Sequence, residues 1–291
     1  MRELEKIADF LAVNTLVFHG RNFENAFAMA AELGFKYVEP AFIKNYYPDI
    51  IDDDFFSAEN GRAFLSMATR VGLKVKSVGV HFNMGDNPDD ADEMKKRLGF
   101  AKELGADIVI TNGAVKQNAK GFFDCIEEVT PVLEDYRLVL ALENPGCGAP
   151  DSIIATGADG AALIETLNNP NVKLNYDASN VYSYSKGKIL PVHDYQNAAP
   201  HTACWHLKQL KQDGERWLFS AVGDGITDYS QILGGIKTEF GMPYMSLELP
   251  VNHMRDRHLA ICKNNDFEVP PDSLIADTLH ESVKFIAAVM E

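Results

Sequence analysis

Four acidic or histidine residues stand near the ends of four apolar runs in the second half of the chain. They are Glu143, Asp177, His206 and Glu248. Carboxylates and imidazole are side chains that bind divalent cations such as Mn²⁺, Mg²⁺, Co²⁺ and Zn²⁺. Three carboxylates buried in one cavity would repel one another unless a cation compensated them. If the four side chains converge, we expect them to bind one divalent metal ion.

The alternation of side chains along each run predicts this convergence. In the run 137–144 three leucines occupy alternate positions, so Glu143 belongs to the opposite face. The same alternation puts Asp177, His206 and Glu248 on the face away from the apolar residues of their own runs. Taken alone, each acid could instead be a helix cap or a salt-bridge partner, and His206 could be a hydrogen-bonded core histidine. The four together favour a shared metal site.

Further polar residues are expected beside this site. His81 is a candidate substrate contact or proton shuttle, or else a packed imidazole. Lys208, two positions after the histidine, could bind an anionic or enolate oxygen or neutralise the acid cluster. We expect Glu39 to face the interior, where it binds substrate or orients a neighbouring ligand or the lysine. Asn144 and Asn180 are short polar groups suited to sugar hydroxyls.

Two segments outside the apolar runs are further candidates for substrate contacts. The segment 252–258 offers Arg255 and Arg257, as anion contacts or as surface residues. The segment 181–195 is either a lid over the substrate or a solvated connector.

Eight short β-rich runs alternate with helical patterns along the chain. They cover residues 11–18, 37–41, 74–82, 106–113, 137–144, 171–180, 203–210 and 244–250. Helix signals lie between them, such as Asn22 as an N-cap with Gly34 beyond the end, and Asp228 before another helical stretch. Eight such repeats predict an α/β protein, a single (β/α)8 TIM barrel spanning residues 1–291. A doubly wound sheet usually has GxGxxG after its first strand, but FHGRNFEN stands there.

Composition narrows the classes of partner. The formal net charge of −15 would repel a phosphate backbone, so we expect no nucleic-acid partner. No apolar run is long enough to cross a bilayer and the N-terminal residues lack a signal-peptide core, so we expect no membrane association. The four cysteines are far apart, which favours a reducing, cytoplasmic setting with free thiols.

Several motifs resemble one known superfamily. LALEN, LNYDASN, WHLK and LELP are similar to the metal-binding strand ends of the xylose isomerase-like barrels, a group of the AP endonuclease family 2 type. This group includes sugar-phosphate isomerases and epimerases, ketose 3-epimerases, inosose dehydratase and endonuclease IV. VEPA and GDGITDY extend the resemblance over nearly the whole chain. It implies the same barrel and the same four metal ligands.

The resemblance also implies where this chain differs from particular members. The ketose 3-epimerases carry Glu, His and Arg where this sequence has Ala149, Asn180 and Gln212. Endonuclease IV needs more histidines than these strand ends provide. The resemblance therefore points to the superfamily rather than to one of its reactions.

These observations predict a metal-dependent isomerase or epimerase of a small sugar-like compound, with a role in carbohydrate metabolism. The reaction would pass through an enediolate, with Glu143 and Glu248 as ligands that double as acid and base, assisted by His81 or Lys208. Two alternatives remain open. One is a dehydratase of a cyclic polyol ketone such as an inosose, and the other is a sugar-binding barrel without catalysis. The resemblance also leaves a homo-oligomer open.

Overall fold

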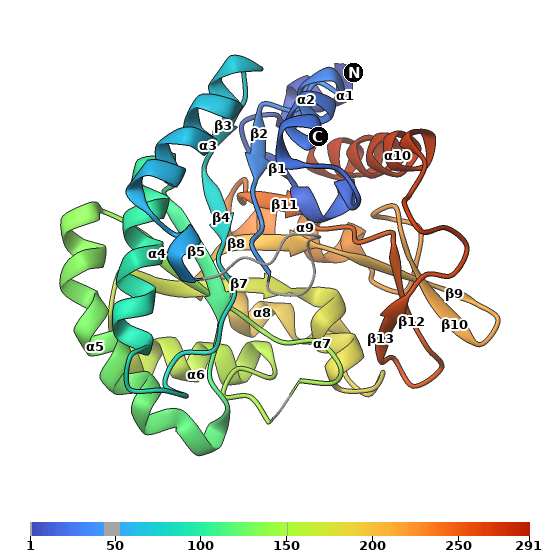
Figure 1. Cartoon of the computed structure of the whole chain (residues 1–291). Helices are drawn as coiled ribbons and strands as arrows, with labels where there is room; N and C mark the ends of the chain where they lie inside the picture. The colour runs from blue at the N-terminus through green and yellow to red at the C-terminus, as the bar shows by residue number, and fades with distance from the viewer. Residues whose placement is uncertain (1, 44–52, 150) are drawn as a thin grey trace.

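A sheet of nine parallel strands, surrounded by helices, forms the centre of the computed structural model (Figure 1). The structure describes residues 2–43, 53–149 and 151–291. The strand order is β3-β2-β1-β11-β8-β7-β6-β5-β4. Because β3 and β4 are consecutive pieces of one run, the order returns to its start and the sheet curls into a barrel. The predicted α/β fold, a single TIM barrel, is confirmed.

All eight predicted runs contain barrel strands, although the strands are shorter than the runs. The barrel strands are β1 Leu11–Asn14, β2 Tyr37–Glu39, β3 Lys74–Val75, β4 Ser77–Gly79, β5 Ile108–Asn112, β6 Val139–Glu143, β7 Val172–Asp177, β8 Thr202–Leu207 and β11 Met245–Leu247.

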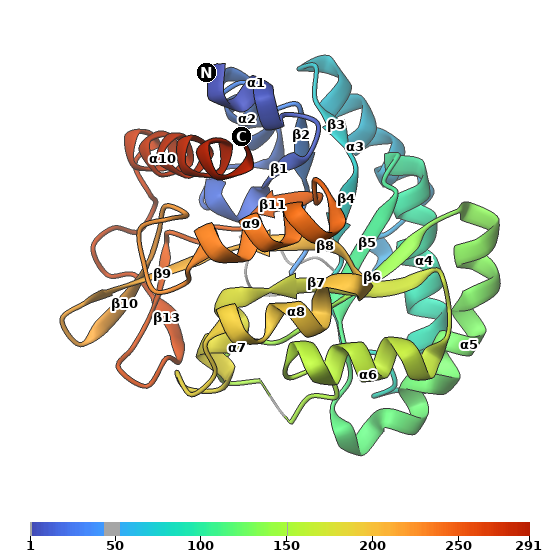
Figure 2. The ribbon, with the colours of Figure 1, turned by 180° about the vertical axis from the view of Figure 1, so that it is seen from behind.

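Helices follow the strands and cover the outside of the barrel (Figures 1 and 2). The α-helices are α1 Arg2–Ile7, α2 Phe23–Glu32, α3 Ala58–Arg70, α4 Asp90–Leu104, α5 Ala119–Tyr136, α6 Gly157–Leu167, α7 Ala178–Tyr184, α8 Tyr195–Ala198, α9 Tyr229–Phe240 and α10 Asp272–Met290. Short 3-10 helices are η1 Thr15–Phe18, η2 Asp53–Phe55, η3 Lys116–Asn118, η4 Pro191–His193 and η5 Ala199–His201. The expected caps are present, since the Asn22 and Asp228 side chains accept hydrogen bonds from the first turns of α2 and α9. None of the helices in the described ranges is both long and apolar enough to cross a membrane.

The third predicted strand is divided at Lys76. β3 pairs with β2, whereas β4 pairs with β5, so the chain changes neighbours between them. At this point the carbonyl of Lys76 accepts hydrogen bonds from the N–H groups of Asp107 and Ile108, at 2.9 and 3.0 Å. A hydrogen bond of 2.7 Å from the Phe42 N–H to the Gly79 carbonyl connects the end of β2 to β4. The divided strand is therefore where the ring closes.

Side chains of the barrel strands divide into two layers. Side chains that point outward, such as Leu140 and Leu142, belong to the large apolar cluster between strands and helices. Side chains that point inward form a smaller cluster, with Ala12, Ala141 and Cys204 among its members. These small side chains fill the middle of the barrel together with the larger Ile108, Ile110 and Tyr244. The polar residues that point in the same direction follow at the carboxyl ends of the strands. The predicted inward direction of these polar residues is confirmed in the strands that carry them.

A second, antiparallel sheet extends from one side of the barrel (Figure 1). It has the order β13-β12-β10-β9, with β9 Gln209–Asp213, β10 Arg216–Ser220, β12 His253–Arg255 and β13 Ile261–Lys263. We call these four strands the side sheet. The sequence interpretation missed it, because it extended the seventh run through residue 210, whereas the barrel strand ends at Leu207 and the next strand begins the side sheet. A Gly214-Glu215 turn between two β-rich segments was the available signal.

Close packing of α3 on α4 gives a test of the fold. A Cβ added to Gly61 in α3 would lie 2.6 Å from the carbonyl oxygen of Phe100 in α4, whereas a Cβ on Gly99 would meet no atom within 4 Å. We expect Gly61→Ala to lower the free energy of unfolding by about 1–3 kcal/mol, because backbone must move. Gly99→Ala should be neutral or stabilise by up to about 1 kcal/mol, because alanine is the better helix former. Urea denaturation of both variants measures the difference, and equal effects would contradict this packing.

Candidate functional site

The four predicted ligands come together at the carboxyl ends of neighbouring barrel strands. Glu143 ends β6, Asp177 ends β7, His206 lies in β8 and Glu248 follows β11 directly. One ligand atom from each lies within 4.8 Å of one from every other, and all four residues are buried. The His206 Nδ1 atom lies 3.3 Å from Glu143 Oε2 and 3.0 Å from Glu248 Oε2. The predicted convergence is thus present in the structure.

Asp177 uses its two carboxylate oxygens for different purposes. Oδ1 accepts a hydrogen bond of 2.9 Å from the Asn180 N–H and so caps α7, which begins directly after the strand. Oδ2 faces the cluster instead, 2.8 Å from Lys208 Nζ. The helix cap holds the carboxylate in one orientation, with its second oxygen directed at the other ligands.

The ligand atoms have the character of a cation site. Asp177 Oδ2, His206 Nδ1 and Glu248 Oε2 are buried, and none has a hydrogen bond of acceptable geometry to any described residue. They lie at ion-pair distances from one another's charged groups, but buried polar atoms normally also satisfy their hydrogen-bonding capacity. Three carboxylates and an imidazole form a ligand set suited to a divalent ion. These residues could therefore hold such an ion, which would satisfy the three atoms together.

Lys208 carries the nearest fixed positive charge. Its Nζ lies 2.8 Å from Asp177 Oδ2 and 2.6 Å from Glu248 Oε2. Burial alone would lower the pKa of this ammonium group, but the two carboxylates hold the pKa well above its usual value. Lys208 is therefore charged, and it offsets part of the repulsion among the acids. Neutralising the acid cluster is one of the two roles predicted for this lysine.

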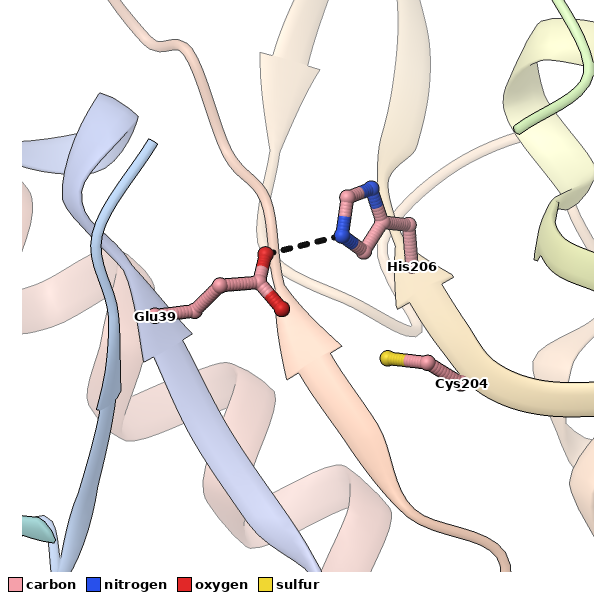
Figure 3. Close-up of side chains that lie close together, drawn as sticks. All are labelled: Glu39, Cys204 and His206. Atoms are coloured by element: carbon pink, nitrogen blue, oxygen red, sulfur yellow. Dashed lines mark hydrogen bonds and ion pairs between the residues drawn. The ribbon is translucent and has the colours of Figure 1, made fainter. Parts of the chain in front are cut away.

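Glu39 contacts the Nε2 atom of His206 (Figure 3), whereas Glu143 and Glu248 lie near the Nδ1 atom of the same ring. Its Oε1 atom is 2.8 Å from His206 Nε2 and accepts a hydrogen bond of 2.6 Å from Asn14 Nδ2, and its Oε2 accepts one from the Ser77 hydroxyl. Burial favours a raised pKa for this carboxyl, but His206 and the hydrogen bonds hold the pKa below its usual value. An ionised carboxylate can only accept, so His206 Nε2 carries the proton and Nδ1 faces the cluster. Glu39 is completely buried, so it touches the histidine rather than the cavity.

Cys204 lies below these two side chains (Figure 3). Glu39, Cys204 and His206 also place ligand atoms close together. Burial raises the pKa of the Cys204 thiol well above its usual value, which favours the uncharged form. A neutral thiol is a poor metal ligand, so this group is a weaker cation site than the four-residue cluster.

A cavity of about 480 Å³ opens above the cluster. Glu143, Glu248, Lys208 and His81 line it, whereas Asp177 and His206 do not. His81 Nδ1 lies 3.1 Å from Asn112 Oδ1, and its Nε2 lies 3.7 Å from Glu143 Oε2. The four residues predicted to do chemistry thus share one accessible surface.

Both predicted asparagines line the same cavity. The Asn144 side chain is already engaged, because it donates to the Asp177 carbonyl and accepts from the Asp177 N–H, both at 2.9 Å. The Asn180 Nδ2 donates to Glu143 Oε1 at 3.0 Å. Asn144 therefore fixes β6 to β7, and Asn180 orients the glutamate.

Sequence reasoning missed three polar residues around the site. Asn14 and Ser77 bind Glu39, and Asn112 binds His81. Each is a polar residue in an otherwise apolar strand, a signal that could have been used. The segment 181–195 contributes no residue to the cavity lining among those described, and its first part belongs to α7.

Comparison with known proteins agrees with this architecture. The family model described as xylose isomerase-like TIM barrel matches residues 27–270. No curated protein matches the chain significantly in sequence.

Three solved structures illustrate the likeness. The probable 3-DHS dehydratase AsbF from Bacillus anthracis is 14% identical over 95% of this chain and 98% of its own, with a TM-score of 0.67. The IolI protein with a bound zinc atom is 16% identical over 96% of this chain and 97% of its own, with a TM-score of 0.66. An L-ribulose 3-epimerase is 16% identical over 96% of this chain and 94% of its own, with a TM-score of 0.69. At these identities the likeness concerns the fold alone.

Proposed function

Because the chain belongs to the xylose isomerase-like TIM barrel family, we propose that it isomerises or epimerises a small sugar or related polyhydroxylated carbonyl compound. The observation that carries the proposal is the convergence of three carboxylates and one histidine beneath a cavity. We infer that Glu143, Asp177, His206 and Glu248 hold one divalent ion. When bound, the ion supplies Lewis acidity that makes a C–H bond beside a carbonyl group easier to ionise.

The accessible residues of the site supply the proton transfers. Glu143 and Glu248 line the cavity and reach it from different strands, β6 and the end of β11. One carboxylate removes the proton beside the carbonyl, and the other returns a proton at a neighbouring carbon or on the opposite face. The Lys208 ammonium, 2.6 Å from Glu248, stabilises negative charge on the substrate oxygens. His81 lies beside Glu143 and passes its proton to or from the substrate oxygen.

A dehydratase of a cyclic polyol ketone is the second candidate. It would begin with the same proton removal and then expel a β-hydroxyl group, which His81 or Lys208 would protonate. Two observations favour keeping it. The similar structures include a probable 3-DHS dehydratase. In addition, Asn180 stands where the ketose 3-epimerases have His, and its side chain is hydrogen-bonded to Glu143 rather than directed only at a substrate.

We propose a cytoplasmic location. All four cysteines are free in the structure, with Cys125 and Cys204 buried. Free thiols persist in a reducing compartment.

The metal site can be tested by elemental analysis of the purified protein. We expect about one divalent ion per chain in the wild type and a strong loss of bound metal in the double variant Glu143→Gln plus Asp177→Asn, because two charged ligands are removed. The double variant Glu134→Gln plus Asp135→Asn is a matched control, since it makes the same charge change at exposed positions of α5. Unchanged metal content in the first variant would contradict the ligand assignment.

The contact between Glu39 and His206 gives a separate prediction. Glu39→Gln keeps the size of the side chain but removes the charge that orients and polarises the imidazole. Loss of such a partner typically weakens metal binding roughly 10- to 100-fold. Competition with a fluorescent chelator measures the dissociation constant of Mn²⁺ or Zn²⁺. An unchanged constant, with normal thermal unfolding, would show that Glu39 only packs beneath the histidine.

The reaction can be tested in D₂O with metal-loaded protein and a panel of aldoses, ketoses and cyclic polyol ketones. We expect deuterium to enter the carbon beside the carbonyl as a new isomer appears, detected by ¹H NMR. Glu143→Gln should lower the rate at least roughly 100-fold, because it removes an acid–base group. Loss of one water, seen as a mass decrease with a new enone absorbance, would identify the dehydratase instead. Binding of a sugar without exchange or water loss would indicate the non-catalytic barrel.

A further inference from the structure

His81 presents one ring nitrogen to the cavity without a hydrogen-bond partner. The residue lies two positions after β4, and its side chain is 8% exposed. Its Nε2 atom is buried and makes no hydrogen bond to any residue in the described ranges. The Glu143 Oε2 atom lies 3.7 Å away, which is too long for a hydrogen bond. Because both residues line the cavity, a small molecule can reach the space between these two atoms.

Asn112, the last residue of β5, contacts the other ring nitrogen. His81 Nδ1 lies 3.1 Å from Asn112 Oδ1, and Asn112 Nδ2 donates a hydrogen bond of 3.1 Å to Asn83 Oδ1. Because the amide nitrogen is directed at Asn83, the amide oxygen faces the ring, and an amide oxygen can only accept a hydrogen bond. Nδ1 therefore carries a proton. In the neutral ring the second nitrogen, Nε2, then has no proton and can act as an acceptor.

Gly79, the last residue of β4, supports the opposite edge of the same ring. A Cβ at this position would lie 3.2 Å from His81 Nε2 and 3.3 Å from His81 Cδ2. The ring therefore lies against the backbone of β4, in space that a larger residue would occupy. Asn112 and Gly79 together fix both edges of the imidazole, so its orientation is set by β4 and β5 rather than by a substrate.

The space between His81 and Glu143 suits a hydroxyl group. The unprotonated Nε2 atom and the carboxylate oxygen are both acceptors, so they need a hydrogen-bond donor between them. A hydroxyl oxygen can lie about 2.8 Å from each, because the two atoms are 3.7 Å apart. A carbonyl or carboxylate group of a substrate has no hydrogen to donate and does not meet this requirement.

We propose that Asn112 is a positioning residue that holds the His81 proton on Nδ1, so that Nε2 accepts the proton of a substrate hydroxyl group. This inference rests on the proposed function and gives the His81 proton transfer its direction. The O–H bond of the substrate breaks, an N–H bond forms at Nε2, and the oxygen keeps the electron pair. The ring, now positively charged, stays bound to Asn112 through Nδ1 and later returns the proton from Nε2 to a substrate oxygen.

Nitrogen-15 NMR of Zn²⁺-loaded protein tests the position of the proton directly. The His81 ring signals are assigned by their loss in His81→Gln. At about pH 8.5, roughly two units above the usual pKa of histidine, we expect a protonated Nδ1 and an unprotonated Nε2 in the wild type. Asn112→Asp, which keeps an oxygen acceptor, should keep the proton on Nδ1, whereas Asn112→Ala should shift it towards Nε2. A proton on Nε2 in the wild type, or an unchanged pattern in Asn112→Ala, overturns the proposal.

Kinetics of deuterium exchange separates positioning from a merely structural role. Asn112→Ala should lower kcat roughly 10-fold or more with little change in KM, because fewer molecules present an unprotonated Nε2. Asn112→Asp should recover most of this loss. In the His81→Gln background Asn112→Ala should have no further effect, since Asn112 acts through His81. Asn25→Ala is the control, because Asn25 is exposed on α2 and should behave as the wild type. Equal losses with and without His81 overturn the proposal.

Failure of this inference can be told apart from failure of the proposed function. The NMR measurement needs no turnover, and the wild-type spectrum is decisive even if a variant of Asn112 unfolds. The expected spectrum in a protein that converts no substrate would contradict the proposed function and leave the position of the His81 proton established. Conversely, isomerisation by a protein whose Nε2 carries the proton would retain the proposed function and overturn the role of Asn112.

Discussion

The electrostatic repulsion among carboxylates buried at one end of the barrel is the constraint on which the site depends. Glu143, Asp177 and Glu248 are buried where they meet, and Glu39 adds a fourth negative charge behind His206. In such surroundings unpaired charges would be strongly destabilising. Lys208 and a protonated histidine compensate part of this charge: burial opposes protonation, but the surrounding carboxylates raise the pKa of His206 well above its usual value. A divalent ion would compensate it more completely: it would take the place of the proton on His206 Nδ1, so that all four predicted ligands could share it.

The barrel makes this concentration of charge feasible by fixing three of the four predicted ligands through separate local interactions. Asp177 is held by the N-terminus of the helix that follows it, and Glu143 by the amide groups of Asn175 and Asn180, at 3.2 and 3.0 Å. His206 is held by Glu39 from behind. Because these contacts belong to three different strand ends, the ligands stay in place through the fold itself rather than through one another.

Much of this arrangement was predictable from the sequence, for a physical reason. A strand that packs against helices on one face has alternate apolar residues, so an acid out of phase with leucines, such as Glu143, must face the interior. The inward direction of the four predicted ligands followed from that rule. The contacts between side chains of different strands could not be predicted in this way, because alternation gives the direction of a side chain and not its partner. The pairing of Lys208 with Asp177 and Glu248, and of Glu39 with Asn14 and Ser77, depends on how neighbouring strands are staggered in the closed barrel.

The side sheet could not be predicted for the same reason, because it depends on which strands pair with one another. β9 follows β8 and β12 follows β11, and these two barrel strands are neighbours. Trp217 in β10 pairs with Arg255 in β12, which joins the two excursions into one unit. Phe219, Arg255 and Ile261 of this unit line the cavity. A rearrangement of the side sheet would therefore reshape one wall of the cavity while every barrel strand kept its register. Substitutions in the side sheet can therefore change the shape and charge of the cavity wall without moving the strand ends that place Glu143, Asp177, His206 and Glu248.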